Sequence, residues 1–164
     1  MSTTRMVGMT GHQGLPTPTA ELVAAALRDT LSRYHPQLVG VTMLGPGADQ
    51  LFARVVLSLG GWLYVVQPTK GRQYRDGFED PEAQAGYDEL YGRASYFEAL
   101  EYTESTEVAH MEAGKVVVDR SSVLVAVWDG EPSRGLGGTA DVVAYARERG
   151  VPVEVIWPEG ASRD

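Results

Sequence analysis

The feature that most constrains this chain is its alternation between short apolar runs and amphipathic stretches of helical spacing. This alternation is typical of βα units, whose parallel strands form one sheet with helices on both faces. Five strands with right-handed crossovers most commonly take the order 3-2-1-4-5. We therefore predict an α/β, Rossmann-like three-layer fold with a mostly parallel five-stranded sheet of that order. The predicted strands are 5–10, 38–44, 62–67, 123–128 and 152–157.

The length and composition of the chain fit a single domain. It has 164 residues, of which 43% are hydrophobic, enough to bury a core. We predict one domain over residues 1–164, with Trp62 and Trp128 in the core and Pro68 ending the third strand. The segment 69–106 breaks the βα alternation, although a helix starting near residue 81 is expected there. Long irregular segments are commonly functional, so we expect an insertion, a lid or an oligomer surface.

The charge of the chain bears on the partners it can take. Lys and Arg number 14 against 22 Asp and Glu, a net charge of −8, and ten of the acidic residues lie in 79–112. Binding to duplex nucleic acid needs a basic face for the phosphates, so we expect no such partner. A small anionic ligand can still be held locally.

Residue types that are missing exclude several chemistries and locations. The chain has no cysteine, which excludes disulfides, thiolate zinc sites and a cysteine nucleophile; we predict no metal and no cofactor. Residues 1–9 contain no apolar run of signal-peptide length, and the uncharged, largely apolar stretch 55–67 is too short to cross a bilayer. We therefore expect a soluble, cytoplasmic protein with no membrane partner.

The predicted strand order also predicts where a ligand binds. In open α/β sheets, ligands bind at the carboxyl ends of the strands where the strand order reverses. Here the reversal lies between the first and fourth strands, so their loops, 10–14 and 129–139, are expected side by side. Both are rich in glycine, the second opens a helix whose N-terminus suits a phosphate, and a third glycine turn, 45–47, ends at the same edge. The candidate ligand-binding residues are Thr10, Gly11, His12, Gly45, Gly47, Asp49, Asp129, Gly137, Gly138 and Thr139.

Alternatives remain open for these residues. Glycines at strand-to-helix turns can serve only backbone conformation or tight packing. His12 either contacts a base or phosphate or faces solvent, and Asp49 either complements the helix dipole or contacts a ribose hydroxyl. The cations Lys70, Arg72 and Arg75 either close over an anion or, as we favour, form a solvated loop face.

Three sequence runs resemble the SLOG superfamily, which unites Smf/DprA-like and LOG-like Rossmannoid proteins. The runs are TGH at 10–12, GADQLFA at 47–53, and VDRSSVLVAVWDG at 118–130 followed by GGTA at 137–140. They are most similar to the YpsA-like branch, and the resemblance spans 6–156. It implies a Rossmann-like sheet that binds a nucleotide or nucleotide-derived ligand at the glycine loops, and it suggests a homodimer.

The resemblance also allows a test for catalysis. LOG enzymes hydrolyse a nucleoside monophosphate to free base and ribose phosphate, and the positions of their glutamate and arginine fall at Val142 and near Ala113. Neither side chain can stabilise an oxocarbenium-like sugar or assist a departing base. Asp141 is one residue away, about 100° around the helix, and Asp129 is the other candidate carboxylate.

Three functions follow for testing. We favour a nucleotide-binding protein that acts as a sensor or carrier. The alternative is a nucleotide N-glycosidase that releases free base, with Asp141 or Asp129 as its catalytic carboxylate. A third possibility is an interaction module that uses the acidic, aromatic stretch 79–112.

Overall fold

The structure, a computed structural model, describes residues 4–163; residues 1–3, at the start of the N-terminal stretch discussed above, and residue 164 lie outside the described part. Within the described part, six strands and six helices alternate along most of its length. They are β1 (Arg5–Gly11), α1 (Thr17–Ser32), β2 (Leu38–Thr42), α2 (Ala48–Ser58), β3 (Trp62–Thr69), α3 (Gln73–Asp76), α4 (Pro81–Gly92), β4 (Tyr96–Tyr102), α5 (Glu107–Asp119), β5 (Val123–Val127), α6 (Thr139–Glu148) and β6 (Val153–Ile156).

The sheet has the order β4-β3-β2-β1-β5-β6, and every neighbouring pair is parallel. The five predicted strands correspond to β1, β2, β3, β5 and β6, and their predicted order is confirmed. The central expectation is also confirmed: β1 and β5 lie side by side, with Val7 opposite Val123 and Gly11 opposite Val127. Their following loops therefore start from the same edge.

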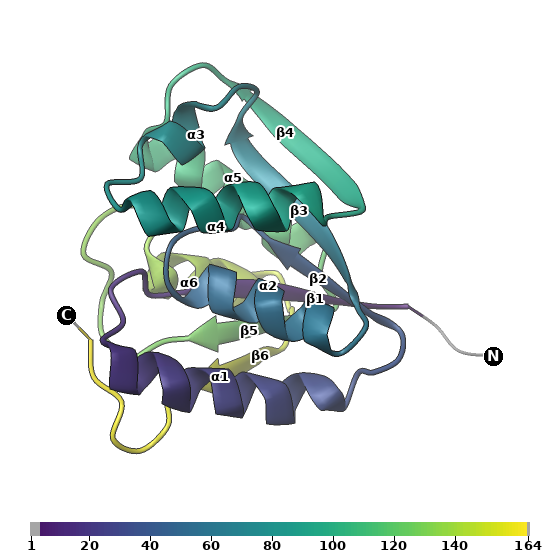
Figure 1. The fold of residues 1–164 in the computed structure, drawn as a ribbon. Coiled ribbons are helices and arrows are strands. Elements are labelled where there is room, and N and C mark those ends of the chain that lie inside the picture. The colour runs from purple at the N-terminus through teal and green to yellow at the C-terminus, as the bar shows by residue number, and fades with distance from the viewer. Residues whose placement is uncertain (1–3, 164) are drawn as a thin grey trace.

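One strand, β4, was not predicted. It lies in the segment 69–106 and extends the sheet at one edge (Figure 1). Its residues are exposed or half-buried, and the exposed fractions of Tyr96 and Phe97 are 51% and 50%. A strand with this little burial has no apolar run to mark it in the sequence. The expected helix is confirmed as α4, where the Asp80 side chain accepts the Glu82 N–H at 2.9 Å and so caps the helix at its start.

Helices cover both faces of the sheet and enclose two cores. In Figure 1, α1, α2 and α4 lie on one side of the sheet and α5 and α6 on the other. Successive side chains of β5 point to opposite faces of the sheet and contribute to different cores. Val123, Val125 and Val127 pack on the side of α1, α2 and α4, whereas Leu124 packs on the side of α5 and α6. The buried strands thus hold both helix layers against one sheet.

Two expectations about the third strand are wrong. Pro68 does not end it, because β3 continues to Thr69. The register against β4 shifts between Gln67 and Thr69, and such an irregularity accommodates a residue that has no N–H to donate. Trp62 is not in the core: its exposed fraction is 43%, because the pairing with β4 starts only at Tyr64. Trp128 is half-buried.

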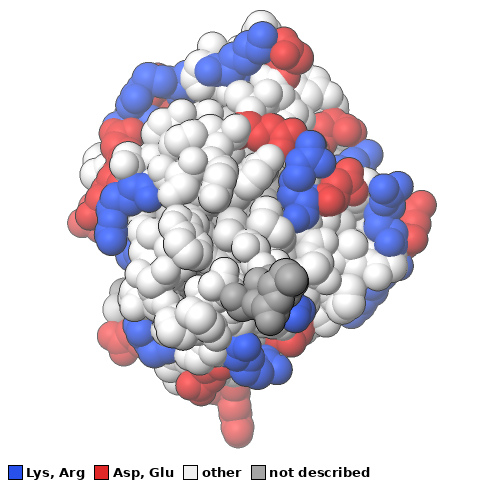
Figure 2. Space-filling model, turned by 90° about the vertical axis from the view of Figure 1, so that its right-hand side faces the viewer, with Lys and Arg blue, Asp and Glu red and all other residues white. Residues whose placement is uncertain are grey.

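Acidic and basic side chains are interspersed on the surface. Figure 2 shows one face, on which blue and red side chains lie next to one another around an uncharged centre. Ion pairs such as Arg54 with Glu89, at 2.6 Å, and Arg120 with Glu98, at 2.8 Å, join different elements. Part of the negative charge is therefore neutralised locally. Among the described residues, no helix has both the length and the hydropathy that a membrane span requires.

Candidate functional site

A cavity of about 330 Å³ opens at the carboxyl ends of β1 and β5. Its walls are the loop 10–14, the loop 131–140, Glu107 and His110 of α5, and Arg163 near the C-terminus. We call it the main cavity. It lies where the strand order reverses, the position at which open α/β sheets bind ligands.

A smaller cavity of about 90 Å³ adjoins the main cavity at the carboxyl end of β2. Gly45, Asp49 and Tyr74 are among its lining residues. The two cavities share five lining residues, so the three glycine turns meet at one rim. The shared residues are Thr10, Gly11, Gln13, His110 and Gly137.

His12 connects the loops after β1 and β5 and is only 4% exposed. Its Nδ1 lies 3.4 Å from the Thr139 hydroxyl, and its Nε2 lies 3.1 Å from the Asp129 carboxylate and accepts the Asp129 N–H at 3.1 Å. Burial, together with the nearby charge of Arg163, holds the pKa of His12 below its usual value despite Asp129. His12 is therefore a buried, neutral imidazole at pH 7, and the solvent-facing alternative is wrong.

The loop before α6 folds back on the first turn of that helix. The Asp141 carboxylate accepts the Gly137 N–H at 3.1 Å, and the Asp141 N–H donates to the Ser133 hydroxyl at 3.1 Å. Gly137 has a φ of +85°, and a Cβ there would lie 3.1 Å from the Met111 nitrogen. The glycine is therefore needed for both conformation and packing, and the Asp141 carboxylate supports the loop.

Two guanidinium groups contribute positive charge to the main cavity. Arg134 and Arg163 both line it, and the positive charge of each lowers the pKa of His12. The Arg163 side chain is 18% exposed, with Nη1 3.6 Å from Asp129 Oδ2. Neither residue was predicted from the sequence. Arg134 is the only cation within 129–139, which could have marked it, whereas nothing in the sequence marks Arg163.

The carboxylates around the main cavity divide into two pairs. Glu107 and Glu131 line it. Asp129 and Asp141, the predicted catalytic candidates, lie behind its walls: Asp129 Oδ1 accepts the Glu131 N–H at 3.0 Å, just as Asp141 binds its own loop. The main cavity thus contains groups of both signs.

Gly47 and Gly11 serve packing between the first loop and α2. Gly47 has a φ of +81°, and a Cβ there would overlap the Gln13 carbonyl oxygen; a Cβ on Gly11 would lie 2.6 Å from the Cβ of Ala48. The Ala48 N–H also donates to the His12 carbonyl at 3.1 Å. For these two glycines the packing alternative explains their presence.

Asp49, Tyr74 and His110 form a titratable group at the smaller cavity. Asp49 Oδ2 accepts the Gly45 N–H at 3.2 Å, and burial raises the pKa of Asp49 to about 6. Burial also raises the pKa of Tyr74, which the Asp49 charge raises further, and it lowers the pKa of His110. The rings of Tyr74 and His110 lie 5.2 Å apart. No sequence signal marks Tyr74 or His110, because α3 and α5 bring them to the rim only in the folded chain.

The positions of the LOG glutamate and arginine are buried and apolar. Val142 is 3% exposed and lines the smaller cavity, and a Cβ on Gly114 would lie 2.9 Å from its Cγ2. Ala113 is fully buried. These side chains fill space between α5 and α6 and supply no acid or base.

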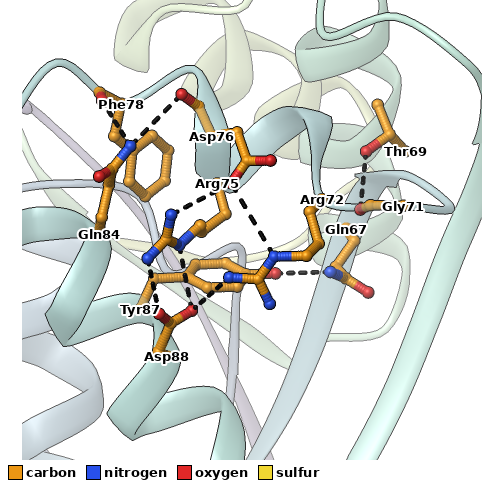
Figure 3. Close-up of polar contacts among 10 residues, drawn as sticks. All are labelled: Gln67, Thr69, Gly71, Arg72, Arg75, Asp76, Phe78, Gln84, Tyr87 and Asp88. Atoms are coloured by element: carbon orange, nitrogen blue, oxygen red, sulfur yellow. Dashed lines mark hydrogen bonds and ion pairs between the residues drawn. The ribbon is translucent and has the colours of Figure 1, made fainter.

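The cations Lys70, Arg72 and Arg75 are held in ion pairs, of which Figure 3 shows those of Arg72 and Arg75. Arg75 binds Asp88 through Nε at 3.1 Å and Nη2 at 2.7 Å, and Arg72 reaches the same carboxylate at 3.2 Å. Lys70 pairs with Glu101 at 2.7 Å. Lys70 and Arg72 line a separate cavity of about 290 Å³ beside α4. The side chains of Lys70 and Arg72 are 64% and 65% exposed, in agreement with the preferred prediction of a solvated loop face, whereas that of Arg75 is only 20% exposed. Among residues 4–163, no three His, Asp or Glu side chains are placed to hold a metal ion.

No protein-family model and no curated protein matches this chain. Solved structures share its fold. DNA processing protein A (DprA) from Streptococcus pneumoniae aligns with 96% of this chain at 18% identity and a TM-score of 0.70, and the chain spans only 52% of that protein.

DprA from Helicobacter pylori, described for its mode of binding single-stranded DNA, aligns with 97% of this chain and 68% of its own length at 13% identity and a TM-score of 0.68. The molybdenum cofactor binding protein from Rippkaea orientalis aligns with 94% of this chain and 77% of its own length at 18% identity and a TM-score of 0.58. At such identities the likeness concerns the fold. The chain therefore has the Rossmann-like fold that is also seen in DprA and in a molybdenum cofactor binding protein.

Proposed function

We propose that this chain, acting as one domain, binds a nucleotide or a nucleotide-derived ligand as a non-catalytic sensor or carrier. The observation that carries the proposal is the meeting of the α6 N-terminus, the glycine-rich loop before it, Arg134 and Arg163 at the main cavity. Each of these features favours an anionic group, and a phosphate is the anion that nucleotides share.

The physical basis is local. The first N–H groups of a helix have no partner within it and carry partial positive charge, so the N-terminus at Thr139 favours a phosphate. Gly137 and Gly138 allow the backbone to approach the ligand closely. Guanidinium groups bind phosphate oxygens through paired, charge-assisted hydrogen bonds. A net charge of −8 does not exclude this, because the attraction is local: Arg134 and Arg163 line the main cavity, although Glu107 and Glu131 line it too.

Similarity to other proteins supports the same function. The sequence runs resemble the SLOG superfamily and its YpsA-like branch, which implies a nucleotide-related ligand at these loops. One protein of this fold is described as binding the molybdenum cofactor and another as binding single-stranded DNA. We extend to this chain only the binding of a ligand by this fold.

Binding is favoured over hydrolysis by the surroundings of the candidate carboxylates. Asp141 accepts a hydrogen bond from its own loop, and Asp129 lies between His12, Arg163 and the Glu131 N–H. Both are engaged in supporting the walls of the main cavity. A glycosidase needs a carboxylate or polar group directed at the sugar.

Isothermal titration calorimetry with mononucleotides, dinucleotides, NAD and ADP-ribose tests the proposal. We expect at least one to bind, and the double variant Arg134→Gln with Arg163→Gln to bind it at least roughly tenfold more weakly, since hydrogen bonds to charged groups contribute about 1.5–3 kcal/mol. The matched control is Arg72→Gln, which removes a guanidinium that pairs with Asp88 and should leave the affinity unchanged. The proposal would be contradicted if none of these ligands binds, or if Arg72→Gln weakens binding as much as the double variant does.

Chromatography of the recovered ligand separates binding from hydrolysis. After incubation with nucleoside monophosphates, we expect the ligand to return intact. Release of free base would instead favour the N-glycosidase alternative.

A further inference from the structure

The smaller cavity holds a carboxyl group that phosphate binding leaves unused. Asp49 lines this cavity from the first turn of α2, together with Tyr74 and Gln13. None of the ion pairs among residues 4–163 includes Asp49. Its Oδ2 accepts the Gly45 N–H at 3.2 Å, and the Thr42 side chain and the Met43 backbone also hydrogen-bond to the carboxylate. Burial raises its pKa in spite of the hydrogen bonds that favour the carboxylate. A carboxylate in such surroundings gains most from further hydrogen-bond donors.

The groups around Asp49 come from several elements. Tyr74 of α3 places its hydroxyl 3.0 Å from the position of a Cβ on Gly45, and Asp49 Oδ2 lies 3.6 Å from that position. His110 of α5 contacts Tyr74 with its ring and has its Nε2 2.7 Å from the Ser105 hydroxyl. The other titratable groups are Tyr87, which raises the pKa of Tyr74, and Glu107, whose charge raises the pKa of His110 against the effect of burial. Polar side chains therefore line the compartment, and its only carboxylate among the lining residues is Asp49.

The smaller cavity lies within reach of a ligand anchored in the main cavity. Thr10, Gly11 and Gly137 line both, so the two spaces share a wall at the end of β1. A volume of about 90 Å³ is several times what one water needs, so a small polar group fits there. A second phosphate would be repelled by the carboxylate, whereas an uncharged group with hydroxyl donors would be attracted.

We propose that the smaller cavity is a sugar subsite, in which the Asp49 carboxylate accepts hydrogen bonds from two vicinal hydroxyls of the ligand and the Tyr74 hydroxyl supplies a further polar contact. This inference rests on the proposed function, because the phosphate in the main cavity is what anchors the sugar. It assigns the ligand to the ribose-bearing class and not to the deoxyribose class.

Protonation of Asp49 gives the subsite a pH dependence. With a pKa of about 6 in the free protein, Asp49 is a carboxylate at pH 7.5 and largely a neutral acid at pH 5. Only the carboxylate accepts two hydroxyl hydrogens well. Preference for a vicinal diol should therefore be present above pH 6 and disappear below it.

Calorimetry with ribose 5-phosphate, 2-deoxyribose 5-phosphate and inorganic phosphate tests the subsite. The two sugar phosphates share the phosphate group, so its own titration cancels in the ratio of their affinities. At pH 7.5 we expect ribose 5-phosphate to bind roughly tenfold more tightly than its deoxy analogue. The ratio should approach one at pH 5, and in the Asp49→Asn variant at both pH values.

The outcomes distinguish the two proposals. Equal binding of both sugar phosphates at pH 7.5, or a preference that persists in Asp49→Asn, overturns the sugar subsite and leaves the phosphate site standing. If neither sugar phosphate binds, and inorganic phosphate and the nucleotide panel also give no heat, both proposals fail. The control variant Arg163→Gln should weaken all three ligands by a similar factor and leave the ratio between the sugar phosphates unchanged.

Discussion

Replacing Gly47 by alanine should destabilise the protein strongly, because two costs coincide at that position. Gly47 precedes α2 with a φ of +81°, a conformation that L side chains rarely adopt, and a Cβ added there would overlap the Gln13 carbonyl oxygen and lie 2.8 Å from the Gln13 Cα. Backbone strain of this kind costs about 1–3 kcal/mol, and overpacking costs about 1–3 kcal/mol more. We therefore expect a loss of about 3 kcal/mol or more.

Gly60, just beyond the other end of α2, provides the matched control. Its φ is +77°, but a Cβ there would meet nothing within 4 Å. Gly60→Ala should therefore cost only the conformational term, about 1–2 kcal/mol. Urea unfolding of the two variants, analysed with a common slope, gives the difference directly.

The same pair of variants also reports on the site. The Gln13 backbone, which the added methyl group of Gly47→Ala would displace, belongs to the loop that lines both cavities. We expect Gly47→Ala to weaken ligand binding and Gly60→Ala to leave it unchanged. Equal losses of stability in the two variants would refute the packing argument.

Three further predictions concern stability. Because the folded-state pKa of Asp49, about 6, lies above its ordinary value of 3.8, the contribution of Asp49 to wild-type stability should fall as the pH rises from about 4 to about 6. Relative to wild type, Asp49→Asn should therefore gain stability over this range and be more stable at pH 7 by up to about 3 kcal/mol in urea titrations. A variant that is less stable than wild type at pH 7 would show that burying the carboxylate carries no such cost. The pKa of His12 is held below 6.5 in the folded protein, so on acidification the imidazole is protonated first in the unfolded chain. Thermal unfolding of His12→Gln should therefore show a weaker loss of stability below about pH 6.5 than wild type. If stability depends on pH equally in both proteins, His12 is not buried as a neutral group. Gly114→Ala should lower the free energy of unfolding by about 1–2 kcal/mol, because its Cβ would lie 2.9 Å from Val142. Adding Val142→Ala should restore part of this loss in a double-mutant cycle. Purely additive losses would show that the two side chains do not compete for space.

The sequence was sufficient for the fold where burial leaves a pattern. Strands such as β5, buried throughout, produce continuous apolar runs, which predicted the strands. Right-handed crossovers between these strands predicted the order that the structure confirms. The edge strand β4 was not predicted, because its exposed aromatic and acidic residues form no continuous apolar run. Trp62 was misplaced for a related reason: hydrophobicity alone does not tell a buried strand position from the uncovered start of a strand.

The candidate site could be predicted only as far as the sheet determines it. Loops that follow neighbouring parallel strands must meet at one edge, so the glycine turns after β1, β2 and β5 could be grouped from the sequence. Tyr74, His110 and Arg163 come to the same rim from α3, α5 and the C-terminal segment, whose paths depend on tertiary packing. The positions of these side chains carry no local signature in the chain.

The direct test of the account is a backbone amide NMR titration with a nucleoside monophosphate. We predict that the largest shifts occur at the N–H groups of Thr139 and Ala140, with smaller ones in the loop 10–14, because the phosphate should sit against the first turn of α6. If the largest shifts instead fall at Arg72 and Arg75, or no amide at the main cavity responds while the ligand binds, the claim that this helix end receives the phosphate is wrong.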